Sequence, residues 1–424
     1  MNLSSTRVLG LIAIVAAVAL SAYWIGNRQS QPAETGAIAD SQPPAEEEPA
    51  EPLRRAPTNG TFPDRHPDIS GDGMPVVAGD VQTDSNAAYT HYRVGERNVK
   101  KIITDGDLVW VGTSGGVIRY DTTRDSYRLF DTRSGLLANG VFHLSKLGGK
   151  LAVGTYGGGL SVMNEDDSWS TYNIPQGLAD AFVYDLLELD NGDIWIATWS
   201  GANLVRDGEL DNPDKWETYT VANTDGGLPN DWVYGLAKGK NGEIWMATEG
   251  GLARFQNERW DNWTHEDGQG APFEEVEDQI RFKNDPADVS KHHARQKQEM
   301  GLQNVSIAYN PNYIVALLVD LDGSVWAGTW GAGLAHFVDG NFVNYTMDNG
   351  LPGNHVFMLY QDSEGLLWVG TSDGLVRREK DGQFTTFTTA DGLYSNIVFA
   401  MARSSDEDFW IGSFGGVARV KALP

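Results

Sequence analysis

Short stretches of alternating apolar and polar residues recur along most of the chain, and glycine-containing turns separate them. In the clearest copy, a strand predicted at 356 to 360 is followed by a polar turn and a second strand at 367 to 371. Further turns lead to a third strand at 375 to 378 and a fourth at 384 to 388. Four short antiparallel strands in about 40 residues are typical of one blade of a β-propeller.

The unit occurs seven times, and the copies align at one position of the second strand. Successive copies are separated by 42, 43, 50, 81, 42 and 42 residues. The aligned residues are Trp110, Ala152, Trp195, Trp245, Trp326, Trp368 and Trp410. Units of this period stack because none can bury its apolar face alone. The sequence therefore predicts an all-β, seven-bladed β-propeller in which these tryptophans are core wedges between blades.

The two ends of the repeat array complement each other. The last unit has only three predicted strands, whereas residues 88 to 92 resemble a fourth strand but precede the first complete unit. We expect this N-terminal strand to pair into the last blade and close the ring, because closure removes an exposed sheet edge.

The repeat also carries a family resemblance. The pattern Gly-Leu-Pro-x-Asn, an alternating strand, Asp-x-x-Gly, Leu-Trp-Val-Gly-Thr and Gly-Leu, seen at 350 to 388, resembles the two-component regulator propeller repeat. The resemblance covers 88 to 424 and implies a ligand-binding sensor domain of a bacterial membrane protein. The shared residues are turn and packing positions, so no particular ligand is implied. Because the chain ends within the last predicted blade, we expect a stand-alone form without a kinase, which reports to a signalling partner protein.

The N-terminal region predicts a membrane segment and a linker. The apolar run from 8 to 25 contains 18 residues, which is just long enough to span a bilayer. We expect residues 1 to 28 to form an uncleaved signal anchor (a transmembrane helix), with a cleaved signal peptide as the alternative. Residues 29 to 86 are rich in Pro and Glu and predict a disordered linker, so the propeller is assigned to 87 to 424. It is expected in the periplasm or outside the cell, anchored to the inner membrane or, after cleavage, secreted.

One spacing is longer than the others, and it locates an insertion at about 266 to 308. Its residues are charged and poor in strand formers, which favours one or two short helices over an eighth blade. We expect the insertion on the rim of the face that carries the turns between second and third strands, either as decoration or as a partial cover.

The same face is the predicted ligand site. One residue per unit follows the second strand, and four of these seven are aromatic, which suits stacking on sugar rings, flat organic ligands or peptide side chains. Packing between blades is the alternative role of these aromatic residues. A second loop set adds amide and carboxyl groups, whose alternative role is hydrogen bonding within their own turns. The predicted ligand-binding residues are Tyr156, Trp199, Glu249, Trp330, Phe414, Asn139, Asp231, Asn312, Asn354, His355 and Asn396.

Composition narrows the chemistry. The formal net charge is -26, which argues against nucleic acid as a partner, because phosphate contacts need clustered Lys and Arg. The absence of Cys excludes disulfides, thiolate metal sites and cysteine nucleophiles. The Asp- and Gly-containing turns at 320 to 323 and 362 to 365 lack the distal Glu of a calcium loop, so no metal is expected. No nucleophile elbow, zinc-binding His pair or nucleotide-binding glycine loop is present, and no cofactor is expected.

These observations favour a membrane-tethered, non-catalytic module that binds an unknown small molecule, either carbohydrate or peptide, or an envelope protein. Two alternatives remain open. The ring could be a structural scaffold in envelope protein assembly, or a propeller lyase or hydrolase that uses His355 and Glu249 as a catalytic pair.

Overall fold

The computed structural model describes residues 60–61, 88–280, 309–421 and 423, all of which belong to one compact unit, 55–424. The predicted anchor at 1–28, nearly all of the predicted linker at 29–86 and part of the insertion, 281–308, lie outside the described residues. Within the described ranges, no helix is long and apolar enough to cross a membrane.

Five separate four-stranded antiparallel sheets form the greater part of the structure. The first contains β6 (Val141–Leu147), β7 (Lys150–Thr155), β8 (Leu160–Met163) and β9 (Trp169–Tyr172). The second contains β10 (Val183–Glu188), β11 (Ile194–Thr198), β12 (Gly201–Val205) and β13 (Trp216–Tyr219). The third contains β14 (Val233–Lys238), β15 (Ile244–Thr248), β16 (Gly251–Gln256) and β17 (Arg259–Trp263). The fourth contains β18 (Asn310–Val319), β19 (Val325–Trp330), β20 (Leu334–Val338) and β21 (Asn341–Tyr345). The fifth contains β22 (Val356–Gln361), β23 (Leu367–Thr371), β24 (Leu375–Arg378) and β25 (Phe384–Phe387).

The two ends of the repeat array share a sixth, eight-stranded sheet. Its strands are β26 (Ala400–Arg403), β27 (Phe409–Gly412), β28 (Phe414–Val420), β2 (Tyr89–Asp105), β3 (Leu108–Thr113), β4 (Gly116–Asp121) and β5 (Ser126–Phe130), with β1 (Gly60–Thr61) paired to β2. The prediction of seven separate blades is therefore wrong: among the described residues there are five separate blades. The physical reason is the length of β2, whose 17 residues join the first and last repeat units without interruption.

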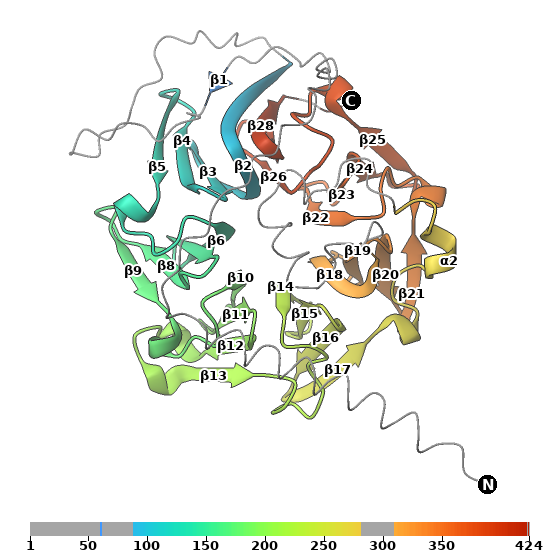
Figure 1. The fold of residues 1–424 in the computed structure, drawn as a ribbon, viewed down its shortest axis with the longest axis horizontal. Helices are drawn as coiled ribbons and strands as arrows, with labels where there is room; N and C mark the ends of the chain where they lie inside the picture. Colours follow the sequence, from blue (N-terminus) through green and yellow to red (C-terminus); the bar gives the residue numbers. More distant parts are fainter. Residues whose placement is uncertain (1–59, 62–87, 281–308, 422, 424) are drawn as a thin grey trace, which may run out of the picture. The chain divides into compact units, whose positions relative to one another are not determined.

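The predicted closing strand is present in the first part of β2. Tyr89 pairs with Val420 and Tyr92 with Val417, whereas the second part of the same strand pairs with β3 from Val99 onward. Around the ring, the inner strands adjoin one another in the order β2, β6, β10, β14, β18, β22 and β26, and β26 adjoins β2 (Figure 1).

Tryptophans at the repeated second-strand position form the core, as predicted. Trp195, Trp326, Trp368 and Trp410 are at most 1% exposed. In four units an Arg of the third strand pairs directly across from this Trp and places its guanidinium carbon 5.4–5.5 Å from the ring centre. The guanidinium therefore covers the ring by a cation–π contact and keeps its charge toward the outside.

Neighbouring blades meet at a contact between a β-branched residue and a small one. In five units a buried Val near the start of the first strand faces Gly in the second strand of the preceding unit. The pairs are Val99 with Gly412, Val141 with Gly112, Val183 with Gly154, Val356 with Gly328 and Val398 with Gly370. At Gly370, an added Cβ would lie 2.7 Å from the carbonyl oxygen of Val398. At Gly412, it would lie 2.4 Å from Cγ1 of Val99, so the same contact closes the ring. No side chain larger than hydrogen fits at these two positions without a shift of the facing strand.

Short helices lie in the connections between sheets. They are η1 (Thr132–Ser134), η2 (Ile174–Gln176), η3 (Arg206–Gly208), η4 (Pro213–Lys215), η5 (His265–Asp267), η6 (Met347–Asn349), η7 (Thr389–Asp391) and α2 (Phe273–Val276). The one α-helix among the described residues, α2, falls in the predicted insertion and confirms its helical character there. Gln279, just after α2, donates a hydrogen bond of 2.8 Å to the Asp348 carboxylate in the next unit.

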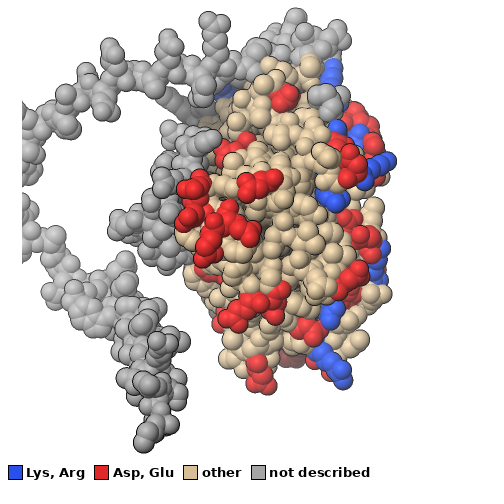
Figure 2. Space-filling model, turned by 90° about the vertical axis from the view of Figure 1, so that its right-hand side faces the viewer, with Lys and Arg blue, Asp and Glu red and all other residues tan. Residues whose placement is uncertain are grey.

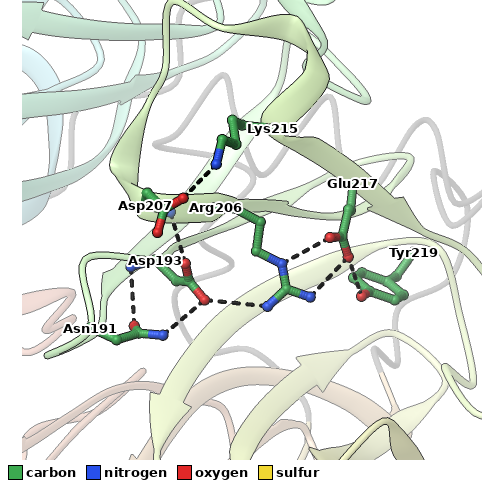
Figure 3. A network of polar contacts seen from close by, with 7 residues as sticks. All are labelled: Asn191, Asp193, Arg206, Asp207, Lys215, Glu217 and Tyr219. Carbon is green, nitrogen blue, oxygen red and sulfur yellow. Dashed lines mark hydrogen bonds and ion pairs between the residues drawn. The ribbon is translucent and has the colours of Figure 1, made fainter.

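Charged side chains on the outside of the blades form ion pairs. In the second sheet, the Arg206 guanidinium binds Glu217 at 2.8 Å and Asp193 at 3.3 Å (Figure 3). Asn191 and the backbone N–H of Asp207 complete the hydrogen bonding of the Asp193 carboxylate. On the side that carries α2, β21 and β25, carboxylate groups gather over the surface and basic groups lie mainly along one edge (Figure 2).

The blade contact predicts a specific sensitivity to one methyl group. Gly370→Ala should lower the free energy of unfolding by about 1–3 kcal/mol, because the new Cβ overpacks the backbone of the next inner strand. Urea denaturation of the full-length chain measures this value. Gly235→Ala is the matched control, since a Cβ there meets its nearest neighbour at 3.4 Å, an ordinary contact. Equal stability of the two variants would contradict the packing argument.

Candidate functional site

A β-bulge at the start of the inner strands positions the candidate site. The register between first and second strands shifts by one residue in all six sheets, for example between Val183 and Asp185 in β10 and between Val233 and Gly235 in β14. A bulge leaves one residue out of the ladder and directs its side chain away from the regular alternation. The bulged residues are Lys100, Phe142, Tyr184, Tyr234, Val315 and Phe357, and Phe399 has the equivalent place before β26.

The bulged residues contact one another from blade to blade. The ring centres of Phe142 and Tyr184 are 4.6 Å apart, and those of Tyr184 and Tyr234 are 4.8 Å apart. On the other side of the ring, Phe357 lies 5.3 Å from Phe399. Because each contact joins two neighbouring inner strands, these side chains form a band on the inner side of the ring.

A second row of aromatic side chains joins this band at the end where the second strands finish. Tyr156 contacts Phe182 at 4.5 Å, Phe182 contacts Trp199 at 5.6 Å, and Trp199 contacts Trp232 at 4.1 Å. The two rows together are called the aromatic belt. It consists of Phe142, Tyr156, Phe182, Tyr184, Trp199, Trp232, Tyr234, Tyr313, Trp330, His355, Phe357 and Phe399.

Two ionisable groups are placed against the belt. The backbone N–H of Glu249 donates to the carbonyl oxygen of Trp232 at 3.1 Å, and its carboxyl acts electrostatically on Tyr313. Burial raises the pKa of Glu249 to about 7. Across the ring, the ammonium of Lys100 lies 4.9 Å from the ring centre of Phe399, and burial lowers the pKa of Lys100 to about 7. In both cases loss of solvent disfavours the charged form.

The residue after the bulge is polar in three successive units, and these side chains form a row of their own. The row consists of Lys101, His143 and Asp185. His143 Nδ1 and Asp185 Oδ1 are 2.7 Å apart, and the other carboxylate oxygen accepts the backbone N–H of Leu236 at 2.8 Å. Burial lowers the pKa of His143, and the charge of Lys101 acts in the same direction. His143 is therefore a neutral imidazole that donates through Nδ1 to the half-buried carboxylate of Asp185.

The aromatic residues predicted from the sequence have different positions. Tyr156, Trp199 and Trp330 lie in the belt, and Glu249 lies beside it. Phe414 begins β28 opposite Asn98, and within the described part of the chain no ring contact joins it to the belt. His355 is 3% exposed and meets the edge of Trp330 at 5.3 Å.

The amide and carboxyl groups of the second loop set form structural hydrogen bonds, as their alternative role predicted. Each side-chain oxygen accepts the backbone N–H of the turn after the preceding fourth strand. The pairs are Asn139 with Thr132 at 2.8 Å, Asp231 with Val221 at 2.7 Å, Asn312 with His265 at 2.6 Å, Asn354 with Met347 at 2.9 Å and Asn396 with Thr389 at 2.9 Å.

Sequence reasoning missed the bulged residues, although a signal for them exists. Val followed by Phe or Tyr occurs at Val141, Val183, Val233, Val356 and Val398, at or just before the start of an inner strand. Strict alternation predicts that the residue after a buried Val points away from the blade contact. It does not show that all of these residues meet on the inner side.

The contacts do not join the proposed catalytic pair. Tyr313 stacks on Trp330 at 5.7 Å, and Trp330 contacts His355, so two aromatic rings connect Glu249 to His355. Burial is the one resolved influence on the pKa of Glu249. Among the described residues, no group of three or more His, Asp or Glu side chains is placed to hold a metal ion.

The repeat pattern can now be compared with known families. The family described as two component regulator propeller matches residues 177–200, 227–250 and 350–373, each of which runs from a turn through an inner strand to the end of the second strand. Three segments of this chain thus match that family's repeat. The predicted resemblance is thereby confirmed, and the matched segments include Tyr184, Trp199, Tyr234 and Glu249 from the belt or its edge.

Solved structures show the same fold at low sequence identity. The extracellular domain of BT3049 from B. thetaiotaomicron, assigned as a hybrid two component system, matches with a TM-score of 0.57 and 19% identity over 77% of this chain. The match covers 40% of that domain, so this chain spans less than half of its length. A streptogramin B lyase matches with a TM-score of 0.52 and 14% identity over 78% of this chain and 96% of the lyase. YCF48 from Cyanidioschyzon merolae matches with a TM-score of 0.52 and 11% identity over 79% of this chain and 99% of YCF48. No curated protein sequence matches the chain.

The raised pKa of Glu249 predicts a pH dependence of stability. Between the ordinary value of 4.5 and about 7, the folded state holds this proton more tightly than the unfolded state, so stability falls as the pH rises through this window. Glu249→Gln should remove about 1–3 kcal/mol of that loss and flatten the profile. Urea denaturation of the full-length chain from pH 5 to pH 8 measures the difference.

Glu217→Gln is the control, because the Glu217 carboxylate is ion-paired with Arg206 and its pKa is lowered, first by that hydrogen bond. This variant should leave the wild-type slope between pH 5 and pH 8 unchanged. Parallel profiles for wild type and Glu249→Gln would show that the carboxyl is charged in the folded state at neutral pH.

Proposed function

We propose that this chain is a non-catalytic, sensor-like module that binds a ligand at the aromatic belt and works outside the cytoplasm. The observation that supports it is the belt itself, which places aromatic side chains from successive blades in contact on the inner side of one ring. The family repeats and the similarity to the extracellular domain of a two component system support the sensor-like character and the location.

Aromatic side chains in such an arrangement suit two ligand classes. Sugar rings stack their C–H faces on Trp and Tyr, and peptides offer aromatic and aliphatic side chains of similar shape. The similarity to YCF48, which has also been solved bound to D1 peptide, supports the peptide class. An envelope protein could present such a peptide as part of its own chain, which is the scaffold alternative.

Catalysis has weaker support. The similarity to streptogramin B lyase is one of fold, at 14% identity. Glu249 and His355 are connected only through intervening aromatic rings, whereas a catalytic acid and base must both reach one substrate. The proposed function therefore assigns Glu249 to the ligand-binding surface, whereas the buried His355 supports Trp330 by a ring contact.

Removal of one aromatic pair from the belt tests the proposal. Trp199 and Trp232 are partly buried and in mutual contact at 4.1 Å, so Trp199→Ala with Trp232→Ala removes stacking area at modest cost to the core. Calorimetric titration of the full-length chain with defined oligosaccharides and with a tripeptide mixture should give binding that weakens at least about tenfold in the double variant.

Trp216→Ala is the matched control, since Trp216 lies in the outer strand β13 of the same blade as Trp199 and donates to the Leu210 carbonyl. Its ligand binding should equal that of wild type. The proposal is wrong if the double variant binds every ligand as tightly as the control does. If the wild-type chain chemically converts the ligand that the double variant no longer binds, the enzyme alternative is favoured instead.

A further inference from the structure

Two charged groups at the belt lack the partners that charged groups have elsewhere in the described structure. No hydrogen bond or ion pair engages the Glu249 carboxyl or the Lys100 ammonium among the described residues. The Lys100 ammonium instead lies over the ring of Phe399, and the Glu249 carboxyl acts electrostatically on Tyr313. By contrast, Arg206, Asp193 and Glu217 form a connected network on the outer side of one blade (Figure 3).

The two groups have opposite charge and come from opposite sides of the ring. Lys100 belongs to β2, and Glu249 follows β15 in the sheet led by β14. In one direction, the inner strands β6 and β10 lie between β2 and β14, and in the other direction β18, β22 and β26 do. Both residues occupy repeat positions that in other units carry belt residues, namely Phe142 for Lys100 and Trp199 for Glu249.

Neither charge is explained by the fold. The bulged residue is Val315 in the β18 unit, and the residue after the second strand is Ser372 in the β23 unit. The same backbone conformation therefore forms with an uncharged side chain at both positions. A charged group that is partly buried beside aromatic rings, without an ion pair, destabilises the fold. Such groups concentrate at binding sites, where a ligand supplies the missing partner.

We propose that the belt selects a short peptide with free termini, whose carboxylate binds Lys100 and whose ammonium group binds Glu249. This inference rests on the proposed function and specifies its ligand. The partly exposed rings of the belt, such as Trp199 and Trp232, contact the peptide side chains. A neutral oligosaccharide would stack on the same rings but would leave both charges without a partner, so the belt discriminates against it.

The test compares free and capped forms of one probe. An equimolar mixture of tripeptides Ala-X-Ala, with X varied over Phe, Tyr, Trp, Leu and Val, is titrated into the full-length chain in three forms: free, N-acetylated and C-amidated. Each cap removes one terminal charge and should weaken binding at least about tenfold, since hydrogen bonds to charged groups discriminate by this order.

Two conservative variants assign each terminus to one residue. The Lys100→Met variant should bind the free and C-amidated mixtures equally tightly. It should still bind the free mixture more tightly than the N-acetylated one. Glu249→Gln should give the reverse pattern, and both variants leave the aromatic contacts in place. Lys238→Met and Glu217→Gln are the controls for net charge, because these side chains are engaged in outer ion pairs with Asp190 and Arg206. Both controls should retain the wild-type pattern.

Three outcomes would overturn the inference: equal binding of free and capped mixtures, capping effects that persist unchanged in both variants, or binding of neutral oligosaccharides alone. The proposed function survives these outcomes if binding of any ligand is lost in the Trp199→Ala and Trp232→Ala double variant. If no ligand of either class depends on that pair, the proposed function fails as well.

Discussion

The contact between neighbouring blades is the interaction on which the rest of the structure depends. In five units a Val near the start of the first strand packs on a Gly in the second strand of the preceding unit, and the closest approaches leave no room for a Cβ. The contact between Val99 and Gly412 is of the same kind, although it joins residues from opposite ends of the chain. Ring closure therefore uses the geometry of the other four contacts, and hydrogen bonds between β2 and β28 reinforce it.

This contact also separates packing from binding. Because the β-branched residue is fixed in the blade contact, the bulge that follows it releases the next residue from the ladder and from the core. Packing fixes the type of the β-branched residue, whereas the fold places little demand on the bulged residue that follows it. Lys, Phe, Tyr and Val all occur at the bulged position. One residue further along, Lys101, His143 and Asp185 lie in three successive units, where the side chains again meet between blades.

Sequence patterns predicted the features that depend on local chemistry repeated many times. The buried tryptophans, the four-strand unit and the strand that closes the ring are confirmed, because each follows from alternation or from the count of strands. The number of separate blades was wrong, because it depends on whether one strand continues from one sheet into the next. β2 continues across a register shift between Arg93 and Asn98, pairing with β28 before it and with β3 after it, and no repeat pattern encodes this continuation.

The candidate site was predicted only in part, for a similar reason. The residues after the second strands could be found from the repeat, and three of them lie in the belt. The bulged residues could not, since a register shift of one residue reverses the face on which a side chain appears. The burial of Lys100 beside Phe399 depends on closure of the ring between β26 and β2, which brings together residues about 300 positions apart. A charge that the chain places against aromatic rings only after closure has no role in starting the fold. The peptide carboxylate of the further inference would supply the opposite charge to this group.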